Sequence, residues 1–476
     1  MAPATVVRMD NSEEAQRGPT GRRIRPGTVF GVVAGAVFGV VMVLLAGTAF
    51  AQRLASQTPE PLLEATHLPP LLTTPGERVE LRYDAFCVVP ESIPDSACDV
   101  EGAVFVRPGD AGPFHELALR ESGSASDGRL GTVVPAAIAR ATGGFSYYAV
   151  LRSRATGTSV TLPAGGAAAP MRSFALARHV DVALGAHAFG RARSATARVA
   201  HAAWGERPLH VGLEQGTNLS PIGGSSFDVS IDGTVHVLDQ ANKRLLRWRA
   251  GAQTPRPVPL SINGTLADLA VAEDGTLYIL ETTAEDGRAP VLRTFAANGT
   301  STATVDLAER ASQVRVGPDG PVVLQNVSGQ WRPAADGNGV LGAAAQQALG
   351  RSGRPLRGGD EVVVLRRDRE VRVAIVGAGG GVRRSWRLRS DTPLAEVQLA
   401  EPIGDRLVLV VRVYSDARDE FVVLLLGERG VDARFSVSSW EWAETAPLSR
   451  FRLAGSFLYQ LRSTPSGLFV DRFDWR

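Results

Sequence analysis

Three segments of this chain repeat one local pattern, and this repetition constrains the fold more than any other feature. Each segment has apolar residues at alternate positions, then an Asp-Gly pair, then a second alternating run. The pairs are Asp232-Gly233, Asp274-Gly275 and Asp319-Gly320. Alternating runs joined by Asp-Gly are a strong short-range signal of a β-hairpin. The aspartates are 42 and then 45 residues apart, so the sequence predicts a hairpin that returns at a regular interval.

The same interval continues to the C-terminus. Hairpin-like pairs of apolar runs begin near residues 227, 269, 314, 360, 406 and 451. A period of about 40–45 residues is typical of one blade of a β-propeller, whose two apolar faces are buried only when blades stack in a closed ring. We therefore predict a six-bladed β-propeller over residues 171–476, with 467–473 as the strand that locks the ring and a short helix at 341–349. Residues 172–215 complete the first blade or add a seventh.

The first repeat resembles an NHL repeat. The residues from Asp232 to Asp239, followed by Asn242 and Arg244, match almost every marked position of that motif. The second and third repeats keep the Asp-Gly pair and lose the Asn and Arg, so the resemblance to the NHL-repeat and SMP-30-like propeller superfamily is strongest over residues 225–335. The resemblance implies the fold. It indicates function only loosely, because propellers of this kind include binding modules, lyases and lactonases.

A second β-domain is predicted before the propeller. About seven short strands divided by Gly, Pro, Asp and Ser turns occupy residues 77–165, a pattern typical of a small β-sandwich. The run from Phe145 to Val150 weakly resembles a late strand of an immunoglobulin- or fibronectin-like fold. The Pro-, Ala- and Gly-rich residues 163–170 are predicted to be a hinge between the domains. The fold class expected for the whole chain is therefore all-β.

The N-terminus predicts a membrane anchor. Residues 28–51 carry no charge and are rich in Val, Leu, Ala and Gly, and arginines precede them. That length spans a hydrocarbon core of about 30 Å, and arginines before the span keep the preceding residues in the cytoplasm. We predict a cytoplasmic tail (1–27), a signal anchor (28–51) and a Pro-rich spacer (52–76), with the β-domains outside. Cleavage after Ala51 would instead release a secreted protein.

The two cysteines agree with export. Cys87 and Cys98 are close in sequence, and in an oxidising compartment such a pair is read as a structural disulfide. The charge balance gives one exclusion. With 51 basic and 49 acidic residues the net charge is +2, whereas a nucleic-acid binder needs a dense basic face.

One set of residues could hold a metal ion. Asp239, Glu281 and Asn326 each lie seven residues after their Asp-Gly aspartate, so they occupy equivalent blade positions. Oxygen ligands from successive blades suit Ca²⁺, as in the SMP-30-like lactonases. Asp and Asn at such positions also close turns with their own side chains, and this structural role is the alternative that we favour.

These patterns together predict a binding module of a bacterial cell envelope. We expect a rigid propeller that presents loops to a protein, peptide or glycan partner, without catalysis and without a cofactor. Two alternatives stay open: a Ca²⁺-dependent lactonase or hydrolase built on Asp239, Glu281 and Asn326, and a propeller lyase that uses a histidine on the ring axis. Four histidines lie between His179 and His210, and His236 lies inside a predicted blade strand; without a nearby pattern of orienting carboxylates, we favour a solvated or turn role for them.

Overall fold

The computed structural model describes residues 62–88, 99–121, 128–154, 156–214, 221–263, 266–282, 290–307, 309–326, 328–335, 341–342, 350–443 and 448–475. Nearly all regular structure in them is β-strand, as the sequence predicts. The predicted tail (1–27), the anchor (28–51) and residues 343–349 of the predicted helix lie outside this set. In the part of the chain that is described, no helix is long and apolar enough to cross a membrane.

The first domain is a sandwich of two sheets. One sheet has the order β1 (Leu62–His67), β3 (Glu80–Val88), β7 (Arg129–Val133), β6 (Arg120–Glu121). The other has the order β2 (Leu72–Thr73), β10 (Met171–Ala175), β8 (Phe145–Ser153), β4 (Val100–Pro108), β5 (His115–Ala118), with β9 (Ser159–Leu162) beside β8. One turn of helix, α2 (Ala136–Ala139), and the 3₁₀ turn η1 (Gly166–Ala168) complete it.

The sandwich extends beyond the limits of 77–165 that the sequence indicates. β1 and β2 lie within the residues predicted as a Pro-rich spacer, and β10 lies beyond the predicted hinge. β10 pairs with β2 on one side and with β8 on the other. Inward-facing residues of both sheets, among them Leu81, Val104 and Leu151, form one buried core. Cys87 lies in β3 and Cys98 lies outside the described residues, so their disulfide stays a prediction.

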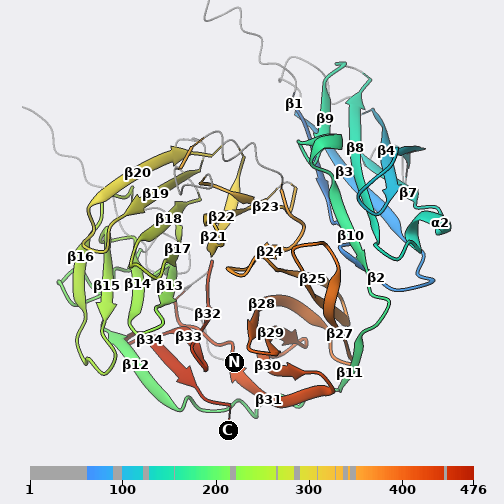
Figure 1. Cartoon of the computed structure of the whole chain (residues 1–476). Helices are drawn as coiled ribbons and strands as arrows, with labels where there is room; N and C mark the ends of the chain where they lie inside the picture. Colours follow the sequence, from blue (N-terminus) through green and yellow to red (C-terminus); the bar gives the residue numbers. More distant parts are fainter. Residues whose placement is uncertain are drawn as a thin grey trace, which may run out of the picture. The chain divides into compact units, whose positions relative to one another are not determined.

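The second domain is a β-propeller, and its described residues form six sheets. We call them blades 1 to 6 and give their strands in sheet order. Blade 1 has β13 (Ser226–Val229), β14 (Val235–Asp239), β15 (Arg244–Trp248) and β16 (Arg256–Pro259); blade 2 has β17 (Ala267–Val271), β18 (Leu277–Glu281), β19 (Val291–Phe295) and β20 (Ser301–Asp306); blade 3 has β21 (Ala311–Gly317), β22 (Gly320–Gln325) and β23 (Trp331–Pro333). Blade 4 has β24 (Arg354–Pro355), β25 (Glu361–Arg367), β26 (Glu370–Val376), β27 (Val382–Ser390) and β11 (Val180–Gly185); blade 5 has β28 (Leu394–Ile403), β29 (Arg406–Tyr414), β30 (Asp419–Gly427) and β31 (Gly430–Ser438); blade 6 has β32 (Phe451–Ala454), β33 (Phe457–Thr464), β34 (Gly467–Phe473) and β12 (Ala197–Ala202). Figure 1 shows them around a common centre, with β13, β17 and β28 toward it and β16, β20 and β31 at the outside.

The three Asp-Gly hairpins predicted from the sequence are confirmed. They join β13 to β14, β17 to β18 and β21 to β22. In the first two turns the aspartate side chain accepts the backbone N–H two residues later, from Thr234 and Thr276, at 2.9 Å in both cases. The intervening Gly233 and Gly275 have φ of +79° and +85°, a conformation that glycine adopts without steric cost.

The ring closes as predicted for a propeller. The C-terminal strand β34 pairs with β12, so blade 6 contains strands from both ends of the propeller domain. Residues 172–215 therefore do not form a blade of their own. Their strand β12 is the outer strand of blade 6, and their strand β11 belongs to blade 4. Apolar side chains pack between blades 1 and 2, 2 and 3, 4 and 5, 5 and 6, and 6 and 1.

Blade 4 packs against the sandwich as well. Leu72, Phe174 and Leu176 form one buried cluster with apolar residues of β25 and β26. Within the same contact Arg372, on β26 and 2% exposed, donates to the backbone oxygen of Leu72 at 2.8 Å and pairs with Glu77 at 2.5 Å. The sandwich and the propeller therefore share a core and a buried ion pair.

Candidate functional site

The residues that the sequence suggests as metal ligands have internal partners. Asp239 is fully buried. It accepts hydrogen bonds from Asn242 and Arg244, both at 2.8 Å, and from the backbone N–H of Gly212 at 2.9 Å. The Asn and Arg of the NHL-like motif thus close the β14–β15 turn around one carboxylate, and Arg244 continues to the backbone oxygens of Arg207 and His210. The motif ties blade 1 to the segment that precedes it.

Glu281 is held in the same way in blade 2. It pairs with Arg293 at 2.7 Å and accepts the backbone N–H of Asn263. Asn326 is exposed, and its backbone N–H donates to the backbone oxygen of Arg310. Throughout the described residues, no group of three or more His, Cys, Asp or Glu side chains could hold a metal ion. The metal site on Asp239, Glu281 and Asn326 stays a prediction, with arginines already engaging both carboxylates.

A cavity of about 860 Å³ lies on the side of the ring where the Asp-Gly turns are. The hairpin turns of blades 1 and 2 and the first strands of blades 3 to 6 contribute to its lining. Polar and apolar residues contribute about equally to its lining. The polar and charged side chains used below are Ser230, His236, Arg247, Arg249, Glu273, Arg315, Arg354, Arg357, Glu401 and Arg452. Its volume is within the range of about 300–1,000 Å³ typical of ligand sites.

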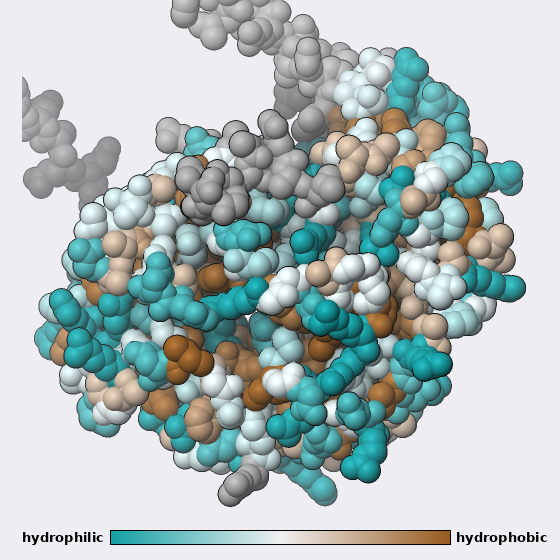
Figure 2. Space-filling model, in the orientation of Figure 1, coloured by the Kyte–Doolittle hydropathy of each residue, from teal (hydrophilic) through white to brown (hydrophobic). Residues whose placement is uncertain are grey.

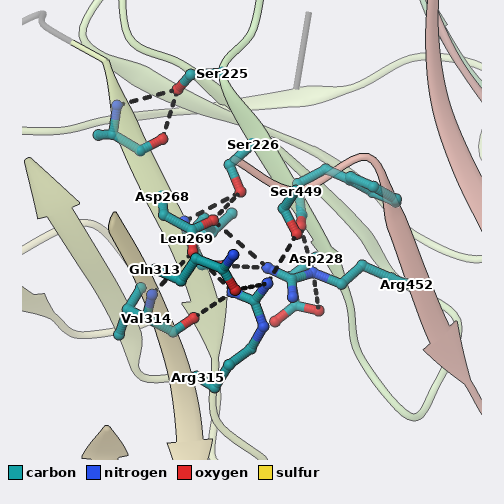
Figure 3. Close-up of polar contacts among 12 residues, drawn as sticks. Ser225, Ser226, Asp228, Asp268, Leu269, Gln313, Val314, Arg315, Ser449 and Arg452 are labelled. Carbon is teal, nitrogen blue, oxygen red and sulfur yellow. Dashed lines mark hydrogen bonds and ion pairs between the residues drawn. The ribbon is translucent and has the colours of Figure 1, made fainter. Parts of the chain in front are cut away.

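A network of four charged side chains from four blades, which we call the floor, lies at this cavity: Asp228, Arg315 and Arg452 line the cavity, and Asp268 is buried against them (Figure 3). Arg452 from blade 6 donates to the backbone oxygens of Phe227 and Leu269, at 2.9 and 2.7 Å. It also lies 3.5 Å from Asp228 of blade 1 and 3.8 Å from Asp268 of blade 2. Burial lowers the pKa of Arg452, and the neighbouring Arg315 lowers it further, whereas the two aspartates raise it.

Asp268 is the centre of this network. Its side chain is 0% exposed and accepts from Arg315 of blade 3 at 2.7 Å. It also accepts from the Ser226 hydroxyl at 2.7 Å and from the backbone N–H of Val314 at 2.9 Å. A buried charge is tolerated only when it is paired and hydrogen-bonded. Asp228 accepts a backbone N–H of blade 2, from Val271, and Asp268 accepts from Val314 and Arg315 of blade 3. The floor network therefore connects each of these blades to the next.

Ion pairs also line the walls. Arg354 pairs with Glu401 at 2.7 Å, joining blades 4 and 5. Arg357, in the turn after β24, pairs with Glu273, in the Asp-Gly turn of blade 2. This last pair joins two blades that are not neighbours in the ring. Figure 2 shows hydrophilic and hydrophobic side chains interspersed over one face, without a single large apolar area.

His236 forms part of the cavity wall, and both of its ring nitrogens are engaged. Arg247 Nε lies 3.4 Å from Nδ1. Arginine can only donate, so Nδ1 is the acceptor and Nε2 carries the proton. Nε2 therefore donates to the Ser230 hydroxyl, 2.9 Å away. Burial, and then the charge of Arg247, lower the pKa of His236 to about 3. A histidine in this arrangement is a fixed hydrogen-bond donor.

His236 is therefore expected to stay neutral from pH 8 to pH 5. Its Cε1–H resonance, identified by its loss in His236→Asn, should not shift over that range, whereas a histidine in a model peptide titrates near pH 6.5. Because the folded-state pKa lies below the unfolded one, this residue should make the fold less stable as pH falls from about 6.5 toward 3. A His236 resonance with a midpoint above pH 6 would show that the nitrogen assignment is wrong.

The tryptophans near the C-terminus lie outside the cavity lining. Trp442 packs against Trp204 with ring centroids 5.9 Å apart, and Trp475 packs against Phe435 at 6.2 Å. Trp440 is 55% exposed. Apart from the imidazole of His236, no aromatic ring lines the cavity among the described residues.

Comparison with known proteins gives no family. No family model matches the chain, and no curated protein matches it. Among solved structures, hydrazine synthase of Kuenenia stuttgartiensis is 14% identical, over 52% of this chain and 76% of that one, with a TM-score of 0.34. Virginiamycin B lyase of Staphylococcus aureus is 9% identical, over 53% and 94%, at 0.33. BamB of Moraxella catarrhalis is 12% identical, over 55% and 100%, at 0.30. Similarities this low carry no argument about function, and the fold rests on the strand pairing described above.

Proposed function

We propose that this chain is a binding module, anchored in a membrane by residues 28–51, whose propeller takes a segment of a protein or peptide partner into its central cavity. The cavity itself is the observation that carries the proposal. It is a pre-formed hollow of about 860 Å³ with a floor made rigid by ion pairs from four blades.

The state of the polar groups in the cavity favours binding over catalysis. A general acid or base needs a proton that can be transferred to a reacting group. His236 has both nitrogens engaged, and Asp228 and Asp268 are paired with arginine. The aspartates of the two turns, Asp232 and Asp274, accept from threonines. What these groups provide is a fixed pattern of donors and acceptors.

The chemistry of the lining favours a peptide over a glycan. Arginine–carboxylate pairs and backbone groups line the cavity, and such groups recognise charged and amide groups of a polypeptide. Apart from the imidazole of His236, no aromatic ring on which a sugar could stack lines the cavity among the described residues. The resemblance of blade 1 to NHL repeats is compatible with a binding role. The location outside the cytoplasm rests on the N-terminal sequence.

Blocking the cavity tests the proposal. Ala250 and Ala297 are exposed alanines that line it, so tryptophan at either position should fill space without disturbing the core. Peptides selected from a displayed random library against the full-length protein should bind Ala250→Trp at least about tenfold more weakly, a change of about 1.4 kcal/mol. Ala417→Trp, in the exposed β29–β30 turn, is the matched control.

Two results would overturn the proposal. One is a library that yields no binder at all. The other is a set of peptides whose affinity, measured by fluorescence anisotropy, is the same for Ala250→Trp, Ala297→Trp and the unmodified protein. In the second case the partner would bind another surface, and the cavity would have no part in recognition.

A further inference from the structure

Blade 1 carries one row of polar side chains from the centre of the ring to its edge. Asp228, His236, Arg247 and Arg256 are paired in register across its four strands. Residues directly opposite one another in an antiparallel sheet project from the same face. Arg247 donates to the backbone oxygen of Ala297 in blade 2 at 2.8 Å, so this face of blade 1 is turned toward blade 2.

The outer half of this row places like charges together. Arg247 and Arg256 are direct cross-strand partners. Arg249 is two residues after Arg247 and directly follows the end of β15. Burial lowers the pKa of Arg247, and the charges of Arg256 and Arg249 lower it further, so the three guanidinium groups act on one another. Like charges opposite each other destabilise a sheet. Local arrangements that oppose stability are expected where a protein binds something.

These arginines lack the carboxylates that pair the other arginines of the cavity. The partners of Arg247 are uncharged, an imidazole nitrogen and a backbone oxygen. The side chains of Arg249 and Arg256 have no hydrogen bond or ion pair with any residue that the structure describes. The nearby Asp232 accepts the backbone N–H and the hydroxyl of Thr234. The charge of Asp232 raises the pKa of Arg247, but among the described residues Asp232 forms no ion pair with these three arginines, so the cluster keeps a net positive charge.

Neighbouring groups are also donors. His236 donates to the oxygen of Ser230, so the hydroxyl proton of Ser230 remains for another acceptor. Ser230, Arg247 and Arg249 all line the central cavity. One side of the cavity thus presents a hydroxyl and two guanidinium groups, which is the donor set that a carboxylate accepts best.

We propose that these three residues, Ser230, Arg247 and Arg249, form a carboxylate-binding subsite, and that the partner segment presents an aspartate or glutamate to it. The inference rests on the proposed function and specifies its ligand. The rest of the lining carries carboxylates and arginines in nearly equal number, with Glu273 in the adjacent blade 2 and Glu401 in blade 5, so the cavity as a whole favours one carboxylate over a dense polyanion. Ile231, 79% exposed beside Ser230, favours an apolar residue next to the acidic one.

The test uses peptides selected against the unmodified full-length protein. They should be enriched in an acidic residue next to an apolar one. Arg249→Gln should weaken a selected peptide at least about tenfold, and changing the peptide's acidic residue to its amide should have a similar effect. The two changes together should cost little more than either alone, because they remove the same contact. Arg249 is exposed and its side chain has no partner among the residues that the structure describes, so its loss should leave the unfolding transition unchanged.

The matched control is Arg429→Gln, an exposed arginine in the β30–β31 turn of blade 5, which should leave the affinity unchanged. Peptides that Ala250→Trp blocks, but that show no acidic enrichment and bind Arg249→Gln normally, would overturn the subsite and leave the proposed function standing. Peptides that Ala250→Trp does not block would overturn the proposed function. Additive effects of Arg249→Gln and the peptide amide would also refute the subsite, because they would show that the two groups do not meet.

Discussion

Replacing Arg452 by methionine is expected to lower the free energy of unfolding by about 3–5 kcal/mol, the usual effect of removing one partner from a buried ion pair. The guanidinium is almost fully buried, and its hydrogen bonds connect blade 6 to blades 1 and 2. Without it, the backbone oxygens of Phe227 and Leu269 lose their side-chain donor. Asp228 loses its arginine, whereas Asp268 keeps Arg315.

Urea denaturation followed by tryptophan fluorescence measures this effect. Arg429→Met is the control, because that exposed side chain has no described partner, and its transition should coincide with that of the unmodified protein. Since the lost contacts join three blades, Arg452→Met should also increase the rate of backbone amide hydrogen exchange in β13 and β17. An unfolding midpoint like that of the control would mean that the floor network does not hold the ring together.

Replacing Arg372 by methionine should cost about 3 kcal/mol by the same argument, now at the contact between the sandwich and blade 4. Arg372 pairs with Glu77 and with Glu370, at 2.5 and 2.6 Å. Glu77 also pairs with Arg367 at 2.5 Å. Because Arg372 and Glu77 interact directly, Arg372→Met with Glu77→Gln should be less destabilised than the sum of the single changes, by about 0.5–3 kcal/mol.

The same contact should make stability depend on pH. Burial raises the pKa of Glu77, but hydrogen bonds from Arg372, from the backbone of Thr74 and from Arg367 outweigh it and lower the pKa to about 2, from 4.5. A carboxylate whose folded-state pKa is lowered stabilises the fold fully above its unfolded value. Its contribution should be lost as pH falls from about 4.5 to 2, and Glu77→Gln should remove this part of the pH dependence. A Glu77→Gln protein with the original acid profile would contradict the assignment.

The fold could be predicted largely from local sequence signals. Asp-Gly turns and alternating runs depend on residues a few positions apart, so the hairpins at Asp232, Asp274 and Asp319 were predictable. The two apolar pairs near 360 and 406 are also hairpins, but they form the second and third strands of their blades, after β24 and β28. Strands β1 and β2 could not be recognised, because their proline-rich surroundings are typical of a spacer. The partner of β2 also lies far along the chain, in β10, whereas β1 pairs with the nearby β3.

The floor of the cavity was missed for a different reason. Asp268, Arg315 and Arg452 each interrupt an apolar strand, and alternation alone treats such a residue as facing solvent. The sequence did contain one signal of a buried charged network: a charged residue recurs within the first strand of successive repeats. The burial of Arg372 was harder to predict. One of its two carboxylate partners, Glu370, is two residues away, but the other, Glu77, lies in the sandwich, 295 residues earlier in the sequence. The turn role of Asp239, in contrast, follows from its NHL-like surroundings.

Locating a bound peptide tests the central claim most directly. A selected peptide carrying a benzophenone group would be irradiated on the full-length protein, and the cross-linked residues identified by mass spectrometry. The account predicts cross-links to cavity residues such as Ser230, Ala250 and Ala297, and their loss in Ala250→Trp. Cross-links confined to the sandwich or to the surface around Trp440 would contradict it.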